Sequence, residues 1–584
     1  MQTVMGSSGK LAAFIVNTGR IFNLVSVINN GTTSTKSNTI ANIYAKFVLN
    51  RFFYLLLTCL LLLPPGLVWA QKTEALPKVY GKKAVKKYAQ TITAAELQEH
   101  LNILASAAYG GRGNGQEGIE LAGKYLADEF AAIGIPPFNG SYYWPYTLLQ
   151  QAWNNPQVTI NGKEYTFMED FYCFARSNGM ADYTTSEVLF LGYGIADARY
   201  SDYKTPDGNP IDVSGKVLVI LNGEPKLPDG NFAITGSPTP SDWTTNWRKK
   251  LETATQKGAK ALLVVVKDME KNIAQYSHYI NGSSFELKDL ATQTNNNGNT
   301  RLNSVYISTQ MAEELLQRKL PDIEANLGKQ PLNFTAAANL RLNLSKKNAE
   351  ITGKNVLGFI EGTDLKDEVL VITAHYDHLG TENGYIYYGA DDDGSGTVAL
   401  LEIAEAFWKA KKEGKGPRRS VLIMPVSGEE KGLLGSQYYT DINPAVPLQN
   451  TIANLNIDMI GRIDPQHKDG NYVYIIGSDK LSTELHRINE KVNKTFTKLT
   501  LDYTYNDEND PNRFYYRSDH YNFAKNNVPV IFYFNGTHDD YHQPSDTVDK
   551  IAFGAMQKRA QLVFYTAWQL ANQTRRIQVD ANKK

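Results

Sequence analysis

The 584-residue chain contains only two cysteines, Cys59 and Cys173, which are too few for a disulfide framework. It also carries no net charge, since 60 basic residues balance 60 acidic ones. Without a basic excess there is no electrostatic reason to expect nucleic-acid binding. Hydrophobic residues make up 42% of the chain and charged residues 21%. These are globular values, and the length is enough for two or three domains.

Long hydrophobic runs are missing as well, apart from one near the N-terminus. Residues 52–63 are almost purely apolar, and two prolines and a glycine end this run. The first 70 residues hold five basic residues and no acidic ones. This pattern indicates a secretory signal peptide cleaved near Ala70, and the run is too short to span a bilayer comfortably. We therefore expect residues 1–70 to be leader and signal peptide, and the mature protein to be exported, periplasmic or extracellular, without a membrane span.

Two alternatives remain for this leader. An uncleaved signal anchor would keep the apolar run, whereas a lipoprotein signal at Cys59 is disfavoured because four leucines follow the cysteine. Residues 1–45 precede the signal and are either an unusually long leader or the result of a misassigned start site. Cleavage would remove Cys59 and leave Cys173 without a partner, so we expect no internal disulfide.

The mature chain is predicted to begin with the first part of a main domain, over residues 85–184. Thr93 and Glu96 form a capping box for a helix that extends to about residue 106, and a second helix is expected over 116–133. Short buried strands follow, predicted at 188–194, 216–221, 261–266 and 303–308.

The turn at 192–195 and the segments that begin at Val213 and Lys257 resemble the protease-associated (PA) domain. That module usually sits as an insert in exopeptidases. We therefore predict a smaller PA-like α/β insert over residues 185–335, and the alternative is an unrelated small α/β domain.

Strands and helices alternate over residues 345–575, the predicted main part of the larger domain. Apolar strands are predicted at 356–360, 369–373, 420–424, 452–457, 472–476 and 528–534, and helices near 396–412, 480–494 and 553–572. Continuous apolar strands separated by helices imply an α/β fold with a mostly parallel sheet covered on both faces. Ligands bind such sheets beyond the carboxyl ends of the strands.

Acidic and histidine residues follow several of these strands. His375 and Asp377 come after the second strand, and if the chain stays extended their side chains share a face, so that Asp377 could orient the imidazole. Three successive acids, Asp391, Asp392 and Asp393, precede a Gly-Ser-Gly turn and a long helix. Consecutive carboxylates repel one another unless cations or water neutralise them.

Further acids and one more histidine follow along the chain. Glu429 and Glu430 come after a strand, Asp458 lies in an apolar run, and His542 lies in a polar loop. Adjacent carboxylates can divide the work, one binding a metal and the other moving protons. A lone acid in an apolar run is costly unless it is paired or metal-bound. Each feature alone has an ordinary structural explanation, but together these carboxylates and imidazoles, without a thiolate, suit zinc or another first-row divalent ion in a hydrolytic role.

Five motifs around these residues resemble those of the secreted dinuclear zinc exopeptidases, the family of bacterial leucyl-type aminopeptidases and glutamate carboxypeptidases. The motifs cover residues 374–380, 389–396, 428–436, 456–462 and 541–547. The resemblance implies a zinc exopeptidase-like fold and two zinc ions per chain. It also implies their ligands: His375 and Asp458 for one ion, Glu430 and His542 for the other, and Asp392 as a bridge between them.

The resemblance further implies that Glu429 is the general base, that Asp377 is the partner of His375, and that Tyr541 helps to stabilise the oxyanion. It also implies a cis peptide bond just after the bridging acid. The protein is therefore expected to be a secreted metal-dependent exopeptidase with peptide substrates. An aminopeptidase, which releases N-terminal residues with water activated by two zinc ions, is the first expectation.

Three alternatives stay open. A carboxypeptidase could use the same site, because Arg513 and Arg517 would suit a substrate carboxylate, where Glu508 and Asp510 would suit an amine. A non-catalytic receptor-like protein on this scaffold would have lost ligands, and this chain keeps all of them. A glutaminyl cyclase uses one zinc ion, and the retention of His375 argues against it.

The remaining histidines near the site are predicted to be packing or pocket residues and not ligands. This applies to His520 and His538 and to the acid Asp519, while His378 is undecided because it follows the motif so closely. The oligomeric state is not predicted.

Overall fold

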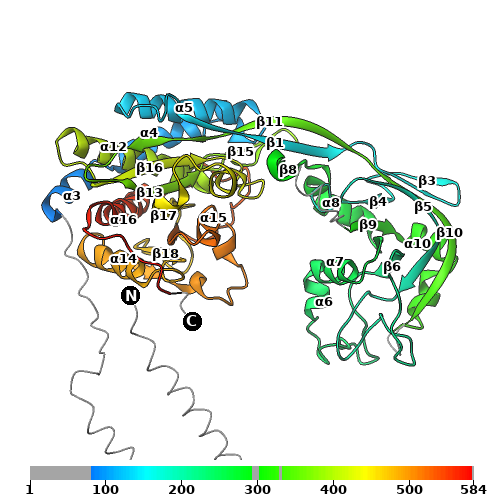
Figure 1. Cartoon of the computed structure of the whole chain (residues 1–584). Coiled ribbons are helices and arrows are strands. Elements are labelled where there is room, and N and C mark those ends of the chain that lie inside the picture. Colours follow the sequence, from blue (N-terminus) through cyan, green and yellow to red (C-terminus); the bar gives the residue numbers. More distant parts are fainter. Residues whose placement is uncertain (1–80, 292–301, 328–331, 582–584) are drawn as a thin grey trace, which may run out of the picture. The chain divides into compact units, whose positions relative to one another are not determined.

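The computed structural model describes residues 81–291, 302–327 and 332–581 (Figure 1). The predicted leader and signal peptide at residues 1–70 lie outside the described residues. Within the described ranges, no helix combines the length and the apolar character that crossing a membrane requires.

A seven-stranded sheet forms the main domain. Its strands run in the order β12 (Gly358–Ile360), β16 (Arg419–Val426), β13 (Leu365–His375), β17 (Thr451–Ile457), β20 (Val530–Phe534), β18 (Tyr472–Ile476) and β19 (Thr500–Asp502). β12 pairs antiparallel with β16, and β18 pairs antiparallel with β20. The other neighbours are parallel, so the predicted mostly parallel sheet is confirmed.

β13 shows why the strands read as continuous apolar runs. Leu370, Ile372 and Ala374 pack into the core on one face of the sheet, whereas Val369 and Val371 pack into a second core on the other face. Side chains alternate between the two faces of a strand, so a strand that is covered on both sides has no polar face.

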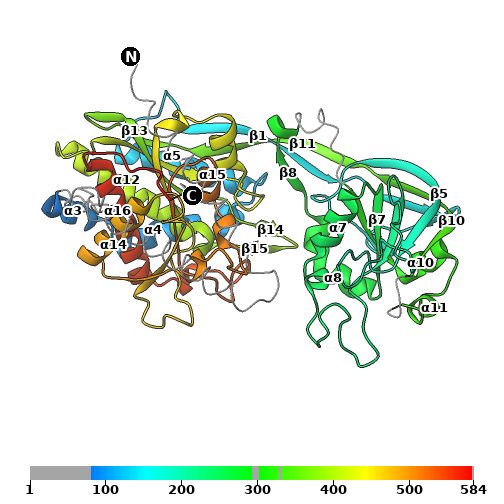
Figure 2. The same cartoon turned by 60° about the horizontal axis from the view of Figure 1, so that its bottom comes forward.

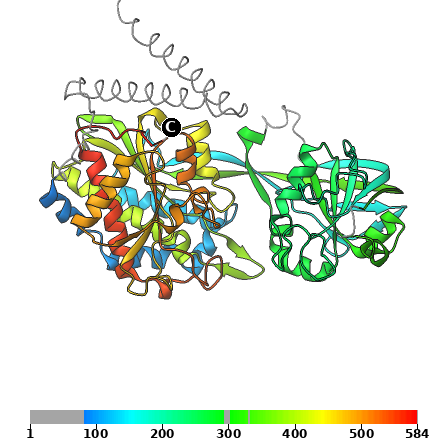
Figure 3. The same ribbon diagram turned by 90° about the horizontal axis from the view of Figure 1, so that it is seen from below.

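Helices cover both faces of this sheet. The first core contains side chains from α3 (Lys82–Ala89), α4 (Ala94–Leu104), α5 (Glu117–Ile133), α12 (Gly396–Lys412), α14 (Thr483–Thr495) and α16 (Phe553–Asn572). The second core contains side chains from α15 (His520–Lys525). Figures 2 and 3 show α14 and α16 side by side. The predicted double cover of the sheet is confirmed.

The chain leaves the main domain through β1 (Tyr143–Trp153) and returns through β11 (Lys346–Val356). These strands pair antiparallel along their whole length, from Tyr143 opposite Val356 to Trp153 opposite Lys346. The short strand β8 (Ser284–Leu287) pairs with the other edge of β1. The two long strands therefore form one ribbon that carries everything between them.

An eight-stranded mixed sheet lies between these two strands in sequence. Its order is β3 (Lys163–Tyr165), β2 (Gln157–Ile160), β10 (Asn333–Leu344), β5 (Ala181–Leu191), β6 (Val217–Leu221), β7 (Ala261–Val266), β9 (Asn303–Ser308) and β4 (Phe171–Tyr172). Strands β5, β6, β7 and β9 are parallel to one another. Helix α10 (Thr309–Leu316) packs on one face and α7 (Trp247–Gln256) on the other. Further helices in this segment are α6 (Asp242–Thr245), α8 (Met269–Asn281) and α11 (Leu320–Glu324).

The strand pairing shows that this insert extends beyond the predicted range 185–335 at both ends. β2, β3 and β4, within residues 157–172, pair inside the insert's sheet, although the sequence assigned them to the main domain. At the other end β10 continues the sheet to Leu344. The early strands are two to four residues long, too short to show the apolar run that marks a buried strand.

Arg112 anchors the segments on either side of the loop that follows β13. Its buried guanidinium donates hydrogen bonds to the carbonyl oxygens of Tyr376 at 2.8 Å, Tyr388 at 2.8 Å and Gly389 at 2.8 Å. It also donates to the carbonyl oxygen of Leu104, at the end of α4, at 2.9 Å. One side chain therefore ties α4 to both ends of the loop between β13 and α12.

Replacing Arg112 with lysine is expected to lower the free energy of unfolding by about 2–4 kcal/mol, because an ammonium cannot reach all four carbonyls and leaves some of them buried without a donor. Urea denaturation followed by circular dichroism measures this loss. Arg418→Lys is the matched control, since Arg418 pairs at 2.6 Å with the largely exposed Asp364, and its expected loss is below about 1 kcal/mol. Equal losses for the two variants would contradict the anchoring role.

Candidate metal centre

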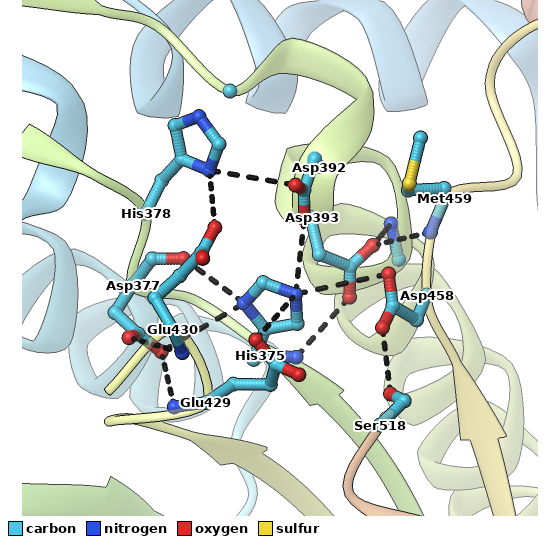
Figure 4. A network of polar contacts seen from close by, with 12 residues as sticks. His375, Asp377, His378, Asp392, Asp393, Glu429, Glu430, Asp458, Met459 and Ser518 are labelled. Atoms are coloured by element: carbon cyan, nitrogen blue, oxygen red, sulfur yellow. Dashed lines mark hydrogen bonds and ion pairs between the residues drawn. The ribbon is translucent and has the colours of Figure 1, made fainter. Parts of the chain in front are cut away.

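The acids and histidines of the main domain meet where its parallel strands end. His375 is the last residue of β13, Glu429 and Glu430 follow β16, Asp458 follows β17, and His542 lies in the loop after β20. The carboxyl ends of these parallel strands lie at one edge of the sheet. The structure thus brings the predicted residues together, and Figure 4 shows the part of the group around His375.

Asp392 enters this group from the turn η2 (Ala390–Ser395), directly ahead of α12. The peptide bond between Asp392 and Asp393 is cis, as the family resemblance implied. Asp392 Oδ1 lies 3.2 Å from His375 Nε2, and Asp392 Oδ2 lies 3.1 Å from His542 Nε2. One carboxylate therefore faces two histidines, one at the end of β13 and one in the loop after β20, which is the placement that a bridging ligand needs.

The first donor set consists of His375, Asp392 and Asp458. His375 Nε2 lies 3.7 Å from Asp458 Oδ1. The hydroxyl of Ser518 donates to the other oxygen, Asp458 Oδ2, at 2.6 Å (Figure 4). This hydrogen bond leaves Asp458 Oδ1 facing the imidazole, and all three donor side chains are buried.

The second donor set shares Asp392 and adds Glu430, His542 and His378. His542 Nε2 lies 3.4 Å from Glu430 Oε2. Burial lowers the pKa of His542, but the carboxylates of Glu430 and Asp392 outweigh it and raise the pKa to about 11. His378 Nδ1 lies 2.8 Å from Glu430 Oε1 and 3.8 Å from Asp392 Oδ2. We call the two sets together the donor cluster: His375, His378, Asp392, Glu430, Asp458 and His542.

His378 is the member that the sequence left undecided. In an extended chain its side chain would point to the face opposite that of His375 and Asp377. The strand ends at His375, however, and the N–H of His378 donates to the carbonyl oxygen of Arg112 at 3.2 Å. This contact holds the backbone of His378, and its buried ring lies against Glu430. Its closeness to the His375 motif was the only sequence signal for it.

Several buried atoms of the donor cluster make no hydrogen bond of acceptable geometry among the described residues, although His378 Nδ1 and Glu430 Oε1 lie 2.8 Å apart. They are His375 Nε2, both ring nitrogens of His378, Asp392 Oδ2 and Glu430 Oε1. Buried polar atoms without partners are costly, and a bound cation removes that cost. Atoms bound to one tetrahedral zinc ion at about 2.0 Å lie about 3.3 Å apart. The spacings of 3.1, 3.2, 3.4 and 3.7 Å within the two sets fit such an ion.

The other two acids of the triplet bind backbone groups instead. Asp393 accepts hydrogen bonds from the N–H groups of His375 at 3.1 Å and Met459 at 3.0 Å. Asp391 accepts from the N–H of Gly461 at 2.6 Å. The triplet therefore does not place three charges in one spot, since its outer members hold the ends of β13 and β17 in position.

Asp377 contacts both the predicted imidazole and the glutamate pair. His375 Nδ1 lies 3.0 Å from the backbone carbonyl oxygen of Asp377 and 3.7 Å from its Oδ1. The carboxylate accepts hydrogen bonds from the N–H groups of Glu429 at 3.2 Å and Glu430 at 3.3 Å, and from the side chain of Asn114 at 2.6 Å. Asp377 thus orients the imidazole mainly through its backbone, and its carboxylate positions the two glutamates.

Glu429 lies beside the donor cluster and lines the same pocket as Asp392, Asp458 and Tyr541. Its Oε2 lies 3.9 Å from His375 Nε2. Burial raises the pKa of the Glu429 carboxyl well above its ordinary value, although the nearby imidazole lowers it in part. A carboxyl group with a raised pKa next to a ligand pocket is suited to proton transfer.

Tyr541 stacks on the ring of His542, with ring centroids 3.9 Å apart. Its phenol oxygen accepts a hydrogen bond from Arg517 Nη2 at 3.2 Å. Burial and the carboxylates of Asp392 and Glu430 raise the pKa of the phenol, so it stays protonated near neutral pH. With its oxygen already bonded, the phenol can direct its proton into the pocket.

The residues predicted to pack lie outside the donor cluster. His520 stacks on Phe532 at 4.7 Å, and burial lowers its pKa to about 3, so the ring is neutral. Asp519 accepts a hydrogen bond from Ser436 at 2.5 Å. His538 Nε2 lies 3.2 Å from Asp391 Oδ2, so His538 contacts an outer acid of the triplet.

Comparison with known proteins gives a family match over the main domain. Residues 355–567 match the profile of peptidase family M28. Over 215 residues the chain is 32% identical to a probable leucine aminopeptidase of Arthroderma otae. The matched segment covers 35% of this chain and 55% of that protein. Over 119 residues it is 34% identical to the probable glutamate carboxypeptidase LAMP1 of Arabidopsis thaliana, 20% of this chain and 16% of that protein. The chain thus spans about half or less of the length of these relatives.

A solved structure shows the same fold. The aminopeptidase from Aneurinibacillus sp. strain AM-1 superposes with a TM-score of 0.50 and 17% sequence identity, over 85% of this chain and 98% of that chain. The sequence match begins just before β12 and ends within α16, so it includes every residue of the donor cluster. Residues 355–567, which carry the whole donor cluster, thus match peptidase family M28.

Proposed function

We propose that the protein is a zinc-dependent exopeptidase, and in the first place an aminopeptidase that releases N-terminal residues from peptides. The observation that carries this proposal is the Asp392 carboxylate between two donor sets, next to Glu429. The relatives support a terminal peptide bond as the target, since one is a probable aminopeptidase and another a probable carboxypeptidase.

Both donor sets fit zinc by the chemistry and spacing of their atoms. The first ion would be held by His375, Asp392 and Asp458, and the second by Asp392, Glu430 and His542, with His378 as a further donor. Bound zinc supplies Lewis acidity, which lowers the pKa of a water to about 7 and polarises a substrate carbonyl.

The residues of the chain then carry the proton transfers. Glu429 takes the proton of the attacking water and later gives it to the leaving amine, and its raised pKa lets it hold the proton in between. Tyr541, whose phenol oxygen is held by Arg517, donates a hydrogen bond to the developing oxyanion. Asp377 keeps the backbone of Glu429 in place for both transfers.

The other readings fit the donor cluster less well. A receptor-like protein has no use for a complete set of buried ligands, and a glutaminyl cyclase uses one zinc ion where this chain has two donor sets that share Asp392. A carboxypeptidase would use the same donor cluster. The pocket beside the donor cluster would then determine which end of the peptide binds.

Export and the PA-like nature of the insert belong to the same proposal. Export rests on the apolar run at 52–63 and its basic flank. The prediction that the insert is PA-like rests on the turn at 192–195, which is built around the buried Asp202. The Asp202 carboxylate accepts hydrogen bonds from the N–H groups of Tyr193 and Ile195, both at 3.0 Å.

The direct test is a metal count combined with activity. We expect two zinc ions per chain by mass spectrometry and hydrolysis of leucyl p-nitroanilide that chelation abolishes and added zinc restores. One ion per chain would favour the cyclase, and hydrolysis that survives complete removal of the metal would refute the proposal.

Glu429→Gln is expected to keep both zinc ions and to lose about 10³-fold or more in kcat, because glutamine cannot accept the proton of the water. Steady-state kinetics with a metal count on the same sample measures both effects. The control is Glu361→Gln, since Glu361 is exposed and lies 3.4 Å from Lys366, and its kcat is expected to be unchanged. Near-normal turnover of Glu429→Gln would remove Glu429 from the mechanism.

His378→Ala is expected to weaken the binding of one zinc ion at least about tenfold and to leave the other in place, because it removes a donor from the second set alone. Competition with a chromophoric chelator measures both affinities, and the spectrum of the cobalt-loaded chain reports on the ligands directly. His100→Gln is the control, since His100 pairs with Glu402 at 3.5 Å. Two unchanged affinities would show that His378 does not contribute to metal binding.

A further inference from the structure

A pocket beside the donor cluster joins the site of chemistry to an apolar wall. Asp392, Glu429 and Asp458 line one side of it. Phe514, Phe532 and Phe534 contribute to the remaining wall, together with Arg517 and Tyr541. Because the pocket is lined by Glu429, the general base of the proposed function, a substrate group next to the cleaved bond would lie at this pocket.

Arg517 is the cation of this pocket. Its Nη2 donates to the phenol of Tyr541 at 3.2 Å, and its guanidinium carbon lies 4.9 Å from the ring centroid of Phe514. The next residue, Ser518, is tied to the donor cluster through its hydrogen bond to Asp458. Within the described parts of the chain, no carboxylate lies within 4.0 Å of the Arg517 side-chain nitrogens.

The other charged residues that the sequence offered for substrate binding are used differently. Asp510 is buried, and its two oxygens accept hydrogen bonds from the N–H groups of Asn512 and Phe514, both at 3.0 Å. Arg513 stacks on Tyr516 at 4.9 Å. Neither of these side chains lines the pocket, and neither does Glu508.

We propose that Arg517 is the specificity determinant of this pocket and that it binds a carboxylate of the substrate. The inference rests on the proposed peptidase function. A guanidinium donates two parallel hydrogen bonds to a carboxylate, so one bond to Tyr541 leaves donors for such a pair. The phenylalanine walls favour the aliphatic part of the same group.

Two parts of a peptide carry this chemistry. One is the side chain of an aspartate or glutamate next to the cleaved bond, and the other is the free C-terminal carboxylate. The first would make the enzyme an aminopeptidase for acidic residues, and the second would make it a carboxypeptidase. Both groups would bind the same guanidinium. The peptide that binds more tightly in its acidic form therefore identifies which of the two carboxylates Arg517 recognises.

Peptide binding tests the inference without turnover. Calorimetry on the zinc-loaded Glu429→Gln chain compares Kd values for glutamyl and glutaminyl peptides with amidated C-termini, and for an N-acetylated dipeptide with a free or an amidated C-terminus. We expect the acidic form to bind at least about tenfold tighter in one of these pairs, as a hydrogen-bonded charge pair provides. Adding Arg517→Gln to the same chain is expected to abolish that ratio.

Two further variants separate direct recognition from an indirect effect. Arg513→Gln in the same chain is the matched control and is expected to keep the ratio, since Arg513 does not line the pocket. Tyr541→Phe is also expected to keep it if Arg517 acts on the substrate directly. Equal or undetectable binding in both pairs, or a ratio that survives Arg517→Gln, would overturn the inference. Failure of the proposed function is seen separately, as a lack of hydrolysis of leucyl p-nitroanilide and of every one of these peptides by the wild-type chain with two zinc ions.

Discussion

The structure of the site depends on burying several ionisable groups at one edge of a parallel sheet. Where water is excluded, the energies between such charges are several times larger than at the surface. Carboxylates alone would repel one another there, and isolated imidazoles would leave ring nitrogens without partners. The chain meets this constraint by facing carboxylates with imidazoles around Asp392. Cations in both donor sets would complete the balance, so the folding of this edge and metal binding are linked.

The segments that carry the donor cluster are held in place by charged side chains that bond to neutral backbone groups. Asp393 binds the N–H groups at the ends of two neighbouring strands, Asp377 binds those of the two glutamates, and Arg112 binds carbonyls at both ends of one loop. A hydrogen bond to the backbone fixes the path of the chain, whichever rotamer the donor side chain adopts. The backbone positions of His375 and Glu430 are therefore set by Asp393 and Asp377, 18 and 53 residues away in sequence, which are not members of the donor cluster.

The sequence predicts the main sheet well because strands covered on both faces leave continuous apolar runs, as in β17 and β18. It misses β2, β3 and β4, whose few residues carry no such signal. At the site the same limit applies to His378, since the sequence pattern does not show that the strand ends at His375 and that the backbone of His378 bonds to that of Arg112. The separate destinations of the three acids at 391–393 also depend on tertiary hydrogen bonds, which no local pattern encodes.

The pairing of β1 with β11 bears on how such a chain could arise. Trp153 and Lys346 face each other across the ribbon, so the two ends of the intervening sequence meet at one rung. Apart from β8, which pairs with the other edge of β1, that sequence lies at the tip of a single long hairpin. An ancestor with a tight turn at this rung would have the same register of β11, and hence the same approach to β12 and β13. A module gained or lost at the tip leaves the strands that carry the ligands in their original alignment.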